Sequence, residues 1–376
     1  MRKVYLRILP FAVLTYFFCY LDRINVGFAS LTMNKDLGLD AAWYGMAAGA
    51  FFWGYVLFEV PSNIILEKLG ARIWIARIMI TWGIISGATA FATGPYSFMT
   101  IRFLLGLNGL WGLRGWQAMY ILEAIPTVLI GIAVFFYLTD RPSEARWLDA
   151  EERGWLDSRM AHERRLIEAQ HGSGVLRAFL DPKVMMLSLN YIGIVTASLG
   201  MLLFLPQIIK ELGVSNMQVG WLTMIPYICG AISMVFCGWL SDRTGERRWS
   251  LFTTCVISTV GLVIAGLTIG TWWSLAGITI AAIGFYGTKG PFWSMPTMFL
   301  TGSAAAAGIA WINSLGNLGG FFGPTLVGWA KDLSGSFAGG LYALGLCALA
   351  SAVISLFWLH IPQTVAAGEE AAALAD

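Results

Sequence analysis

Two short stretches decide how this chain folds: residues 67–74 read EKLGARIW, and residues 242–249 read DRTGERRW. Both follow one pattern, in which an acid and a base precede a glycine, an arginine stands two places after the glycine, and a tryptophan ends the stretch. Glycine permits a tight turn, and the charges can interact with neighbouring helix ends. A generic basic loop explains one copy. Two copies, each after the second apolar run of its half, predict an internal repeat.

The chain around these stretches is rich in apolar runs. Hydrophobic residues make up 57% of the 376 positions and charged residues only 12%. Ten runs have roughly the 17 to 25 residues that a helix needs to cross a bilayer. We place these runs at approximately 8–30, 43–66, 73–93, 116–138, 184–209, 217–240, 250–270, 273–289, 304–330 and 337–360. Because a water-soluble fold of this size needs far more polar surface, we predict an all-α polytopic membrane protein.

The basic residues predict how the chain is oriented in the membrane. Arg2, Lys3 and Arg7 precede the first run, which places the N-terminus in the cytoplasm. With sides alternating from there, cytoplasmic segments hold 18 of the 24 lysines and arginines, external segments hold five, and Arg23 lies inside a run. We therefore expect a multi-pass protein of the plasma membrane, specifically a bacterial inner membrane, with both termini in the cytoplasm.

The runs group into two bundles around a polar linker. We expect an N-terminal helical bundle over residues 1–138, a cytoplasmic linker over 139–183, a C-terminal bundle over 184–362 and a disordered tail over 363–376. In each half two runs precede the repeated stretch, but four follow it in the second half and only two in the first. We predict that the first half has lost two spans between its third and fourth runs.

Several motifs occur in an order that is specific when they are taken together. They are YLDRIN at 20–25, FEVPSN at 58–63, TWG at 81–83, DRP at 140–142, RWL at 146–148, LPQI at 205–208 and NSLGNLGG at 313–320. In these motifs the chain resembles the anion:cation symporter branch of the major facilitator superfamily, which includes sugar-acid, tartrate, phthalate and 4-hydroxyphenylacetate transporters.

The resemblance also locates the missing spans. In the family, the motif found here as RFLLG at 102–106 continues into a fourth helix. Here it runs directly into NGLWGLRGWQ at 108–117, a string that stands just before the sixth helix in relatives. The resemblance therefore implies a major facilitator fold of two helical bundles with about ten helices, four plus six, where twelve are usual. Most of helix four and all of helix five are absent.

The first run holds an adjacent acid and base, Asp22 and Arg23. Charges inside a membrane are costly, so each needs a partner or a function. The planar fork of Arg23 suits a carboxylate substrate, and a buried carboxyl such as that of Asp22 can hold a proton near neutral pH. Together they suit an anion carried with a proton. The alternative is an ion pair that satisfies itself, or one at the external interface.

Further candidates in the first half depend more on the resemblance. It makes Tyr55 and Arg102 substrate contacts, although a tyrosine in a span is as often packing, and Arg102 sits on the stub of the missing helix. Glu59 lies one turn after Tyr55 and is a candidate for proton coupling. The alternative is that Glu59 pairs with Arg77. The acid that the family places seven positions after Arg102 is Gly109 in this chain.

In the second half, residues 289–293 read KGPFW and break the eighth run near its end. Freed carbonyls at membrane depth are tolerated where they line a cavity. Trp293 is a candidate to cover a substrate or, alternatively, an interfacial anchor. Asn313 and Asn317 are four residues apart, on one helix face. Family position favours substrate contact for Asn313 and packing for Asn317.

Together these features predict a secondary active transporter that takes up a small organic anion with protons by alternating access. The anion is a sugar acid or an aromatic or hydroxy carboxylate. The alternative is a non-transporting remnant of an internal deletion. We expect no enzyme activity, because no catalytic constellation or phosphate-binding loop is visible. We likewise expect no cofactor, metal or nucleic acid. The expected partners are the carboxylate, protons and the lipid bilayer. The expected state is a monomer, unless another protein covers the gap in the first bundle.

Overall fold

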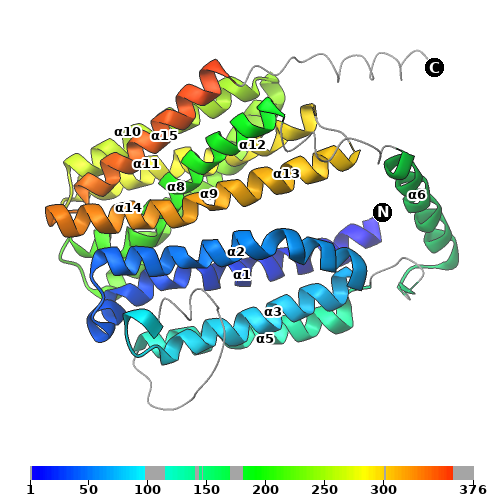
Figure 1. Ribbon diagram of the computed structural model, residues 1–376, viewed down its shortest axis with the longest axis horizontal. Helices are drawn as coiled ribbons and strands as arrows, with labels where there is room; N and C mark the ends of the chain where they lie inside the picture. Colours follow the sequence, from blue (N-terminus) through cyan, green and yellow to red (C-terminus); the bar gives the residue numbers. More distant parts are fainter. Residues whose placement is uncertain are drawn as a thin grey trace. The chain divides into compact units, whose positions relative to one another are not determined.

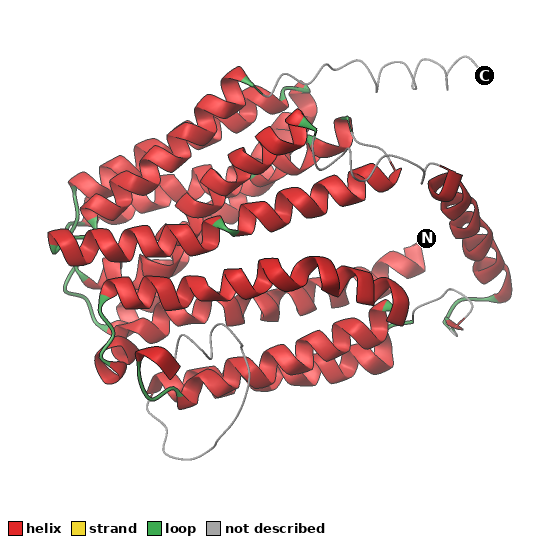
Figure 2. Ribbon diagram, in the orientation of Figure 1, coloured by secondary structure: helices red, strands yellow, loops and turns green. Residues whose placement is uncertain are grey.

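The computed structural model describes residues 2–97, 115–139, 144–145, 147–169, 181–299 and 302–358, and the regular elements within them are all helices (Figure 1 and Figure 2). They are α1 (Arg2–Leu37), α2 (Ala41–Leu69), α3 (Ala71–Ala88), η1 (Thr89–Phe91), α5 (Gly115–Tyr137), α6 (Ala150–Ala169), α8 (Pro182–Lys210), α9 (Asn216–Thr244), α10 (Arg247–Leu267), α11 (Trp272–Gly287), α12 (Lys289–Ser294), η3 (Pro296–Met298), α13 (Gly302–Asn317), α14 (Gly319–Ser334) and α15 (Ala338–Phe357). The tail over 363–376 lies outside the described residues.

The helices follow the expected runs, with one correction. Among the described residues, five helical stretches are long and apolar enough to cross a membrane: Arg72–Phe91, Pro182–Lys210, Asn216–Thr244, Arg247–Leu267 and Ala338–Phe357. The run at 304–330 was expected as a single helix, and this is wrong, since α13 ends at Asn317 and α14 begins at Gly319. Paired small residues are a common cause of such kinks, and here Gly319 and Gly320 follow the break directly.

Both copies of the repeated stretch form a short helix–helix connection with a glycine at positive φ, although ψ is 152° at Gly70 and −3° at Gly245. In the first, Gly70 has a φ of 89° between α2 and α3, and in the second, Gly245 has a φ of 69° between α9 and α10. A side chain at such positive φ is strained, so glycine suits the point at which each first helix ends. The next helix begins directly after Gly70 in the first copy and after Glu246 in the second. In the second copy, Arg247 Nη1 lies 2.5 Å from Asp242 Oδ1 across the turn. The pattern therefore encodes a helix–glycine–helix connection in both halves.

Two compact units make up the chain. Unit 1 comprises Met1–Leu39 and Ala50–Ala169, and unit 2 comprises Asp40–Gly49 and Gln170–Asp376. In unit 1, α3 packs closely along α5, because a side chain at Gly83 would meet Val128 and the carbonyl of Ala124. The α1 helix joins them through the ring of Phe11, whose centroid lies 4.7 Å from that of Tyr137.

Unit 2 is assembled on glycine contacts around α8. The backbones of α8 and α14 meet at Gly319. A Cβ atom added to this glycine would lie 2.6 Å from the backbone nitrogen of Thr196. The α10 and α11 helices meet in the same manner through Gly261 and Gly277. Small residues that allow helices to approach are the usual packing device in membranes, where burial of apolar surface gives no preference for protein over lipid.

The first turns of α2 belong to unit 2. The Asp40 carboxylate accepts a hydrogen bond from the Trp43 amide at 2.7 Å and so caps α2 locally. Asp332, at the end of α14, accepts from the amides of Ala41 and Ala42 at 3.2 and 2.7 Å. These two carboxylates satisfy three of the amide groups that a helix N-terminus leaves without an intrahelical partner.

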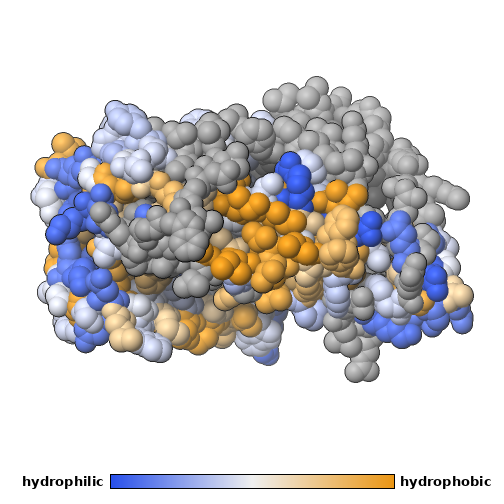
Figure 3. Space-filling model, turned by 90° about the horizontal axis from the view of Figure 1, so that it is seen from below, coloured by the Kyte–Doolittle hydropathy of each residue, from blue (hydrophilic) through white to orange (hydrophobic). Residues whose placement is uncertain are grey.

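Large apolar side chains cover much of the outer surface. On α5, Ile125, Leu129 and Phe136 are 50%, 59% and 79% exposed, and on α9 the side chains of Trp221 and Val235 are 66% and 71% exposed. Figure 3 shows apolar residues gathered in the middle of the visible face, with polar residues toward both ends. Soluble monomers rarely expose apolar patches of such size, so these faces contact lipid.

Candidate functional site

The candidate pair Asp22 and Arg23 lies in the middle of α1. The side chains of residues 18–23 lie outside the described part of the structure, and the closest described polar group is Asn25, which is 2% exposed. Asn25 Nδ2 donates a 2.6 Å hydrogen bond to Glu123 Oε2 on α5. Asn25 Oδ1 is buried and has no hydrogen-bond partner within the described residues. A polar link between α1 and α5 therefore lies two residues from the candidate arginine.

Sequence reasoning did not single out Glu123. The signal was present, because Glu123 is an acid inside the apolar run at 116–138 and so carries the same indication of function as Asp22. Its partner could not be identified, since Asn25 and Glu123 are 98 residues apart in the chain and meet only when α1 packs against α5.

The Tyr55 ring belongs to a group of aromatic side chains in unit 1. This half-buried ring has its centroid 6.1 Å from that of Phe51, which lies in turn 5.3 Å from the ring of Trp82 on α3. The rings hold one side of Tyr55 in place. The residue thus has a packing role, and a hydroxyl at the tip that is chemically suited to a polar ligand.

The remaining candidates of the first half have less structural description. Glu59 lies in α2, but its side chain is outside the described residues, and Arg102 and Gly109 lie outside them altogether. Arg77, the alternative partner considered for Glu59, holds its guanidinium over the ring of Trp74 at 3.9 Å from the centroid. That contact is a cation–π interaction, which an arginine can combine with an ion pair.

The predicted break before Trp293 is confirmed. The α11 helix ends at Gly287, Thr288 forms a turn, and α12 starts at Lys289. Pro291 has no N–H to donate to the carbonyl one turn earlier, so the ladder is interrupted here. The half-buried ring of Trp293 lies edge-on to Tyr191 at 5.1 Å and to Phe292 at 5.2 Å.

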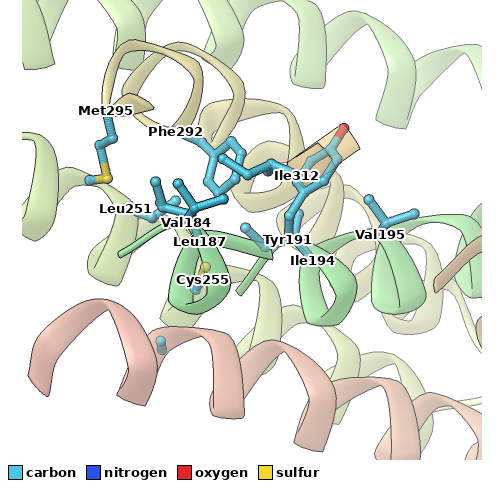
Figure 4. Packing of buried hydrophobic residues seen from close by; sticks show 11 residues of the cluster. Val184, Leu187, Tyr191, Ile194, Val195, Leu251, Cys255, Phe292, Met295 and Ile312 are labelled. Carbon is cyan, nitrogen blue, oxygen red and sulfur yellow. The ribbon is translucent and has the colours of Figure 1, made fainter. Parts of the chain in front are cut away.

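Tyr191 belongs to a cluster of buried side chains, against which Trp293 packs. Figure 4 shows this cluster from close by. The Tyr191 ring stacks on Phe292 at 4.8 Å, and Ile312 of α13 packs in the same cluster. Gly316 also abuts the Tyr191 ring, which occupies the space of a side chain there. Asn313 lies on α13 between these two contacts and is half-buried. The Tyr191 ring therefore contacts Trp293 and, through Gly316, the helix that carries Asn313.

The two asparagines of α13 differ in their surroundings. Asn317 is 7% exposed, and its Nδ2 donates to the backbone carbonyl of Asn313 at 2.8 Å, one turn earlier. A buried asparagine amide that bonds its own helix beside the kink at Leu318 helps to satisfy the interrupted backbone. The half-buried Asn313 side chain is the more accessible of the two.

A cavity of about 330 Å³ lies between α3 and α5. Its lining is apolar and includes Ile84, Phe91, Ile121, Ile125 and Leu129. An anion requires donors or positive charge, which these side chains do not offer. The cavity is therefore suited to an acyl chain or another apolar group, and the anion site is better sought among the polar residues described above.

Comparison with known proteins gives the class and the family. A D-xylose-proton symporter structure has a TM-score of 0.73 at 14% identity and covers 96% of this chain and 98% of that chain. A bacterial homologue of the lysosomal transporter Spinster has a TM-score of 0.68, also at 14% identity, and covers 93% of this chain and 95% of that one. These likenesses define the fold, which is built of helical bundles.

The family follows from sequence. A model of the Major Facilitator Superfamily matches residues 12–113, 108–324 and 201–374, and the chain belongs to this family of secondary transporters. A proposed tartrate transporter of Agrobacterium vitis is 44% identical over 95% of this chain and 94% of its own length. The quinolone resistance transporter of Acinetobacter baumannii is 34% identical over 94% of this chain and 93% of that protein. The inner membrane transport protein RhmT of Escherichia coli is 31% identical over 97% and 96%.

The same comparisons bear on the missing spans. The match to the Agrobacterium vitis protein is 406 residues long, whereas 95% of 376 residues is about 357, so about 50 of its positions have no counterpart in this chain. The first two matches to the family model meet at residues 108–113, inside the junction expected from the sequence. The segment 98–114 is too short for two helices of about 20 residues each. The first half therefore has fewer spans than the second.

Proposed function

We propose that this transporter carries a small hydroxy carboxylate of the tartrate type together with protons. The observation that carries the proposal is the 44% identity to two proposed tartrate transporters over 95% of this chain. The chemistry of the first run agrees with it, because an arginine beside an acid within an apolar helix suits an anion and a proton.

The roles follow from the residues. Arg23 binds the carboxylate with two parallel hydrogen bonds, and Asp22 carries the proton. Tyr55, Trp293 and Asn313 shape the site and contact the substrate hydroxyls or carbon skeleton. Glu59 is a second candidate for proton coupling, and Arg102 is a further candidate for substrate contact. The Asn25–Glu123 bond supports this assignment by holding α1 against α5 next to Arg23.

The membrane setting completes the proposal. The protein lies in a bacterial inner membrane as a monomer, with both termini in the cytoplasm. The excess of basic residues in alternate segments supports this orientation. Transport proceeds by alternating access, in which the two bundles move so that the site opens first to one side and then to the other.

Uptake into proteoliposomes tests the proposal. With an acidic exterior, vesicles holding this chain should accumulate labelled tartrate above the level of empty vesicles, and a protonophore should abolish the accumulation. Arg23→Gln should lose at least about tenfold in initial rate, since a charge-assisted bidentate contact is removed. Lys183→Gln, a change at the first turn of α8, should retain the wild-type rate. No uptake across a broad panel of organic acids contradicts the proposal.

The alternative is that the chain is a non-transporting remnant. About 50 positions of the match to the Agrobacterium vitis protein have no counterpart in this chain, and this favours the alternative. A chain in which the corresponding stretch of an Agrobacterium vitis relative is inserted after Leu107 separates the two cases. If this restored chain transports and the native chain does not, the remnant is the correct description. Equal transport by both shows that the four-span bundle suffices.

A further inference from the structure

The cavity between α3 and α5 is a groove with a buried floor and an open rim. Its walls are two rows of residues at helical spacing, which are Ile84, Ala88 and Phe91 on one side and Ile121, Ile125 and Leu129 on the other. Each row covers seven or eight residues, so the groove is about 10 to 12 Å long. Ala88 and Ala124 at its floor are buried, whereas Ile84, Ile125 and Leu129 at its rim are exposed. Because Arg72–Phe91 is long and apolar enough to cross a membrane, the groove lies at membrane depth.

The internal repeat explains why the first half has a groove here. Ser258 of α10 stands 13 residues after Gly245, and its hydroxyl donates to the Ala281 carbonyl of α11 at 3.3 Å. Gly83, which stands 13 residues after Gly70, contacts α5 and lines the groove. The α11 helix is the first span after α10, and the first span after α3 is among those absent from this chain. The groove therefore lies at a position that a further helix covers in the second half.

The lining selects an apolar occupant. All ten residues that line the groove are glycine, alanine, valine, isoleucine, leucine or phenylalanine. A polar molecule would lose its hydrogen bonds to water and find no polar side chain in return. Apolar cavities of about 150 Å³ already stay dry and accept small apolar molecules. This groove has about twice that volume, about 330 Å³.

The volume distinguishes a single hydrocarbon chain from a helix. Two turns of an α-helix, with a diameter of about 10 to 12 Å, occupy on the order of 1,000 Å³. A helix of a second copy or of another protein could therefore lie over the rim but could not reach the floor. The acyl chains of one leaflet extend over about 15 Å, half of the hydrocarbon core, so one chain is long enough to fill the groove. A flexible chain also gains dispersion contacts with a floor that would otherwise have none.

We propose that the groove between α3 and α5 binds one acyl chain of a membrane phospholipid, which fills part of the space that the absent spans leave. The chain lies along the floor formed by Ala88 and Ala124, and the exposed side chains of Ile84, Ile125 and Leu129 enclose it. The headgroup stays outside the groove, so binding does not depend on the kind of headgroup. In the proposed orientation, the end of α3 and the start of α5 are external, and the chain belongs to the external leaflet.

Photo-crosslinking of the full chain in proteoliposomes tests the proposal. The probe is phosphatidylcholine with a diazirine in the middle of one acyl chain, and mass spectrometry of peptides locates the labelled residues. Phosphatidylglycerol with the same labelled chain reports on the headgroup. Ala88→Phe fills the groove from its floor. Ala231→Phe is the matched control, since it makes the same change at an exposed alanine of α9. Leu129→Trp fills the groove from its rim and replaces Ala88→Phe if that variant does not fold.

In the wild type, the residues of the groove should be labelled at least about fivefold more than the exposed face of α9, with either headgroup. Ala88→Phe and Leu129→Trp should reduce the labelling of the groove to the level of α9, and Ala231→Phe should leave it unchanged. The proposal is wrong if the groove of the wild type is labelled no more than α9, if neither filling variant lowers the labelling, or if only one headgroup gives it. A second copy seated on the rim also contradicts the proposal. In that case Leu129→Cys should form a disulfide-linked dimer on oxidation that the wild type does not form, and the groove should stay unlabelled.

Discussion

Asn25 Nδ2 donates a 2.6 Å hydrogen bond to Glu123 Oε2, and this bond joins α1 to α5 at the level of the candidate arginine. A hydrogen bond to a carboxylate is among the stronger ones in proteins, and here it joins a buried asparagine to a half-buried glutamate. Because lipid can replace apolar contacts between helices, this bond helps to fix the position of α1, and with it the position of Arg23.

A double-mutant cycle measures that dependence. Asn25→Ala and Glu123→Ala should each lower the free energy of unfolding in detergent, and the coupling between them should be about 1 to 3 kcal/mol, as for hydrogen bonds to charged groups. Thr15→Ala is a control, because among the described residues its hydroxyl bonds the Phe11 carbonyl of its own helix. Additivity of the two changes within about 0.5 kcal/mol would show that the bond contributes nothing.

The glycine contact between α10 and α11 predicts a contrast between two identical substitutions. A methyl group at Gly284 would lie 2.5 Å from the Thr254 carbonyl oxygen and would also meet Ser258, whereas no atom lies within 4 Å of one at Gly220. Gly284→Ala should therefore cost about 1 to 3 kcal/mol through overpacking. Gly220→Ala should be neutral or stabilise α9 by up to about 1 kcal/mol. Melting temperatures in detergent check both, and equal effects of the two changes refute the close approach.

The contacts of Asp332 give a prediction for the stability of the first turns of α2. Its carboxylate accepts from the Ala41 and Ala42 amides, so Asp332→Ala should cost about 0.5 to 2 kcal/mol, in the range of a lost helix cap. Asp332→Asn keeps an acceptor but loses the attraction of the charge to the helix dipole, which is about 0.3 to 1 kcal/mol. Thermal unfolding should rank the proteins as wild type, asparagine variant and alanine variant. An alanine variant as stable as the wild type contradicts the cap.

Some of these structural features could be predicted from the sequence, and others could not. The helix–glycine–helix turns at Gly70 and Gly245 follow from local chemistry, and the pattern predicted them. The break at Leu318 was missed, because glycines in a membrane helix are as compatible with close packing as with a kink. The partnership of Asn25 with Glu123 depends on which helices pack together. One sequence without its tertiary contacts does not contain that information.

A surface contact outside the membrane gives a prediction for pH and salt. Lys3 Nζ lies 2.8 Å from Glu152 Oε1 and 3.6 Å from Asp149 Oδ2 on the polar segment that precedes and begins α6. The hydrogen bond to Glu152 raises the pKa of Lys3 above its ordinary 10.5. The backbone hydrogen bond from Glu152, with the nearby lysine, lowers the pKa of Asp149 below its ordinary 3.8.

The signs of these shifts set the pH window. A raised lysine pKa means that the contact is complete below pH 10.5 and is lost as the pH rises through the folded value. A lowered aspartate pKa means that it is complete above pH 3.8 and is lost as the pH falls through the folded value. Spin labels at Ile8 and Ser158 should give a narrow distance distribution at pH 7. The distribution should broaden when the pH passes either folded pKa. It should also broaden in 1 M salt, where the interaction of exposed charges is screened within about 3 Å. A distribution as broad at pH 7 as in Lys3→Gln would show that the contact does not form.

The central claim, that this chain carries an organic anion together with protons, is tested most directly by the internal pH of proteoliposomes. The vesicles enclose a pH indicator and start with equal pH on both sides, and tartrate is then added outside. The interior should acidify in vesicles with the wild-type chain, but not in empty vesicles or in vesicles with Arg23→Gln. Entry of labelled tartrate without any change in internal pH, or no entry at all, would contradict it.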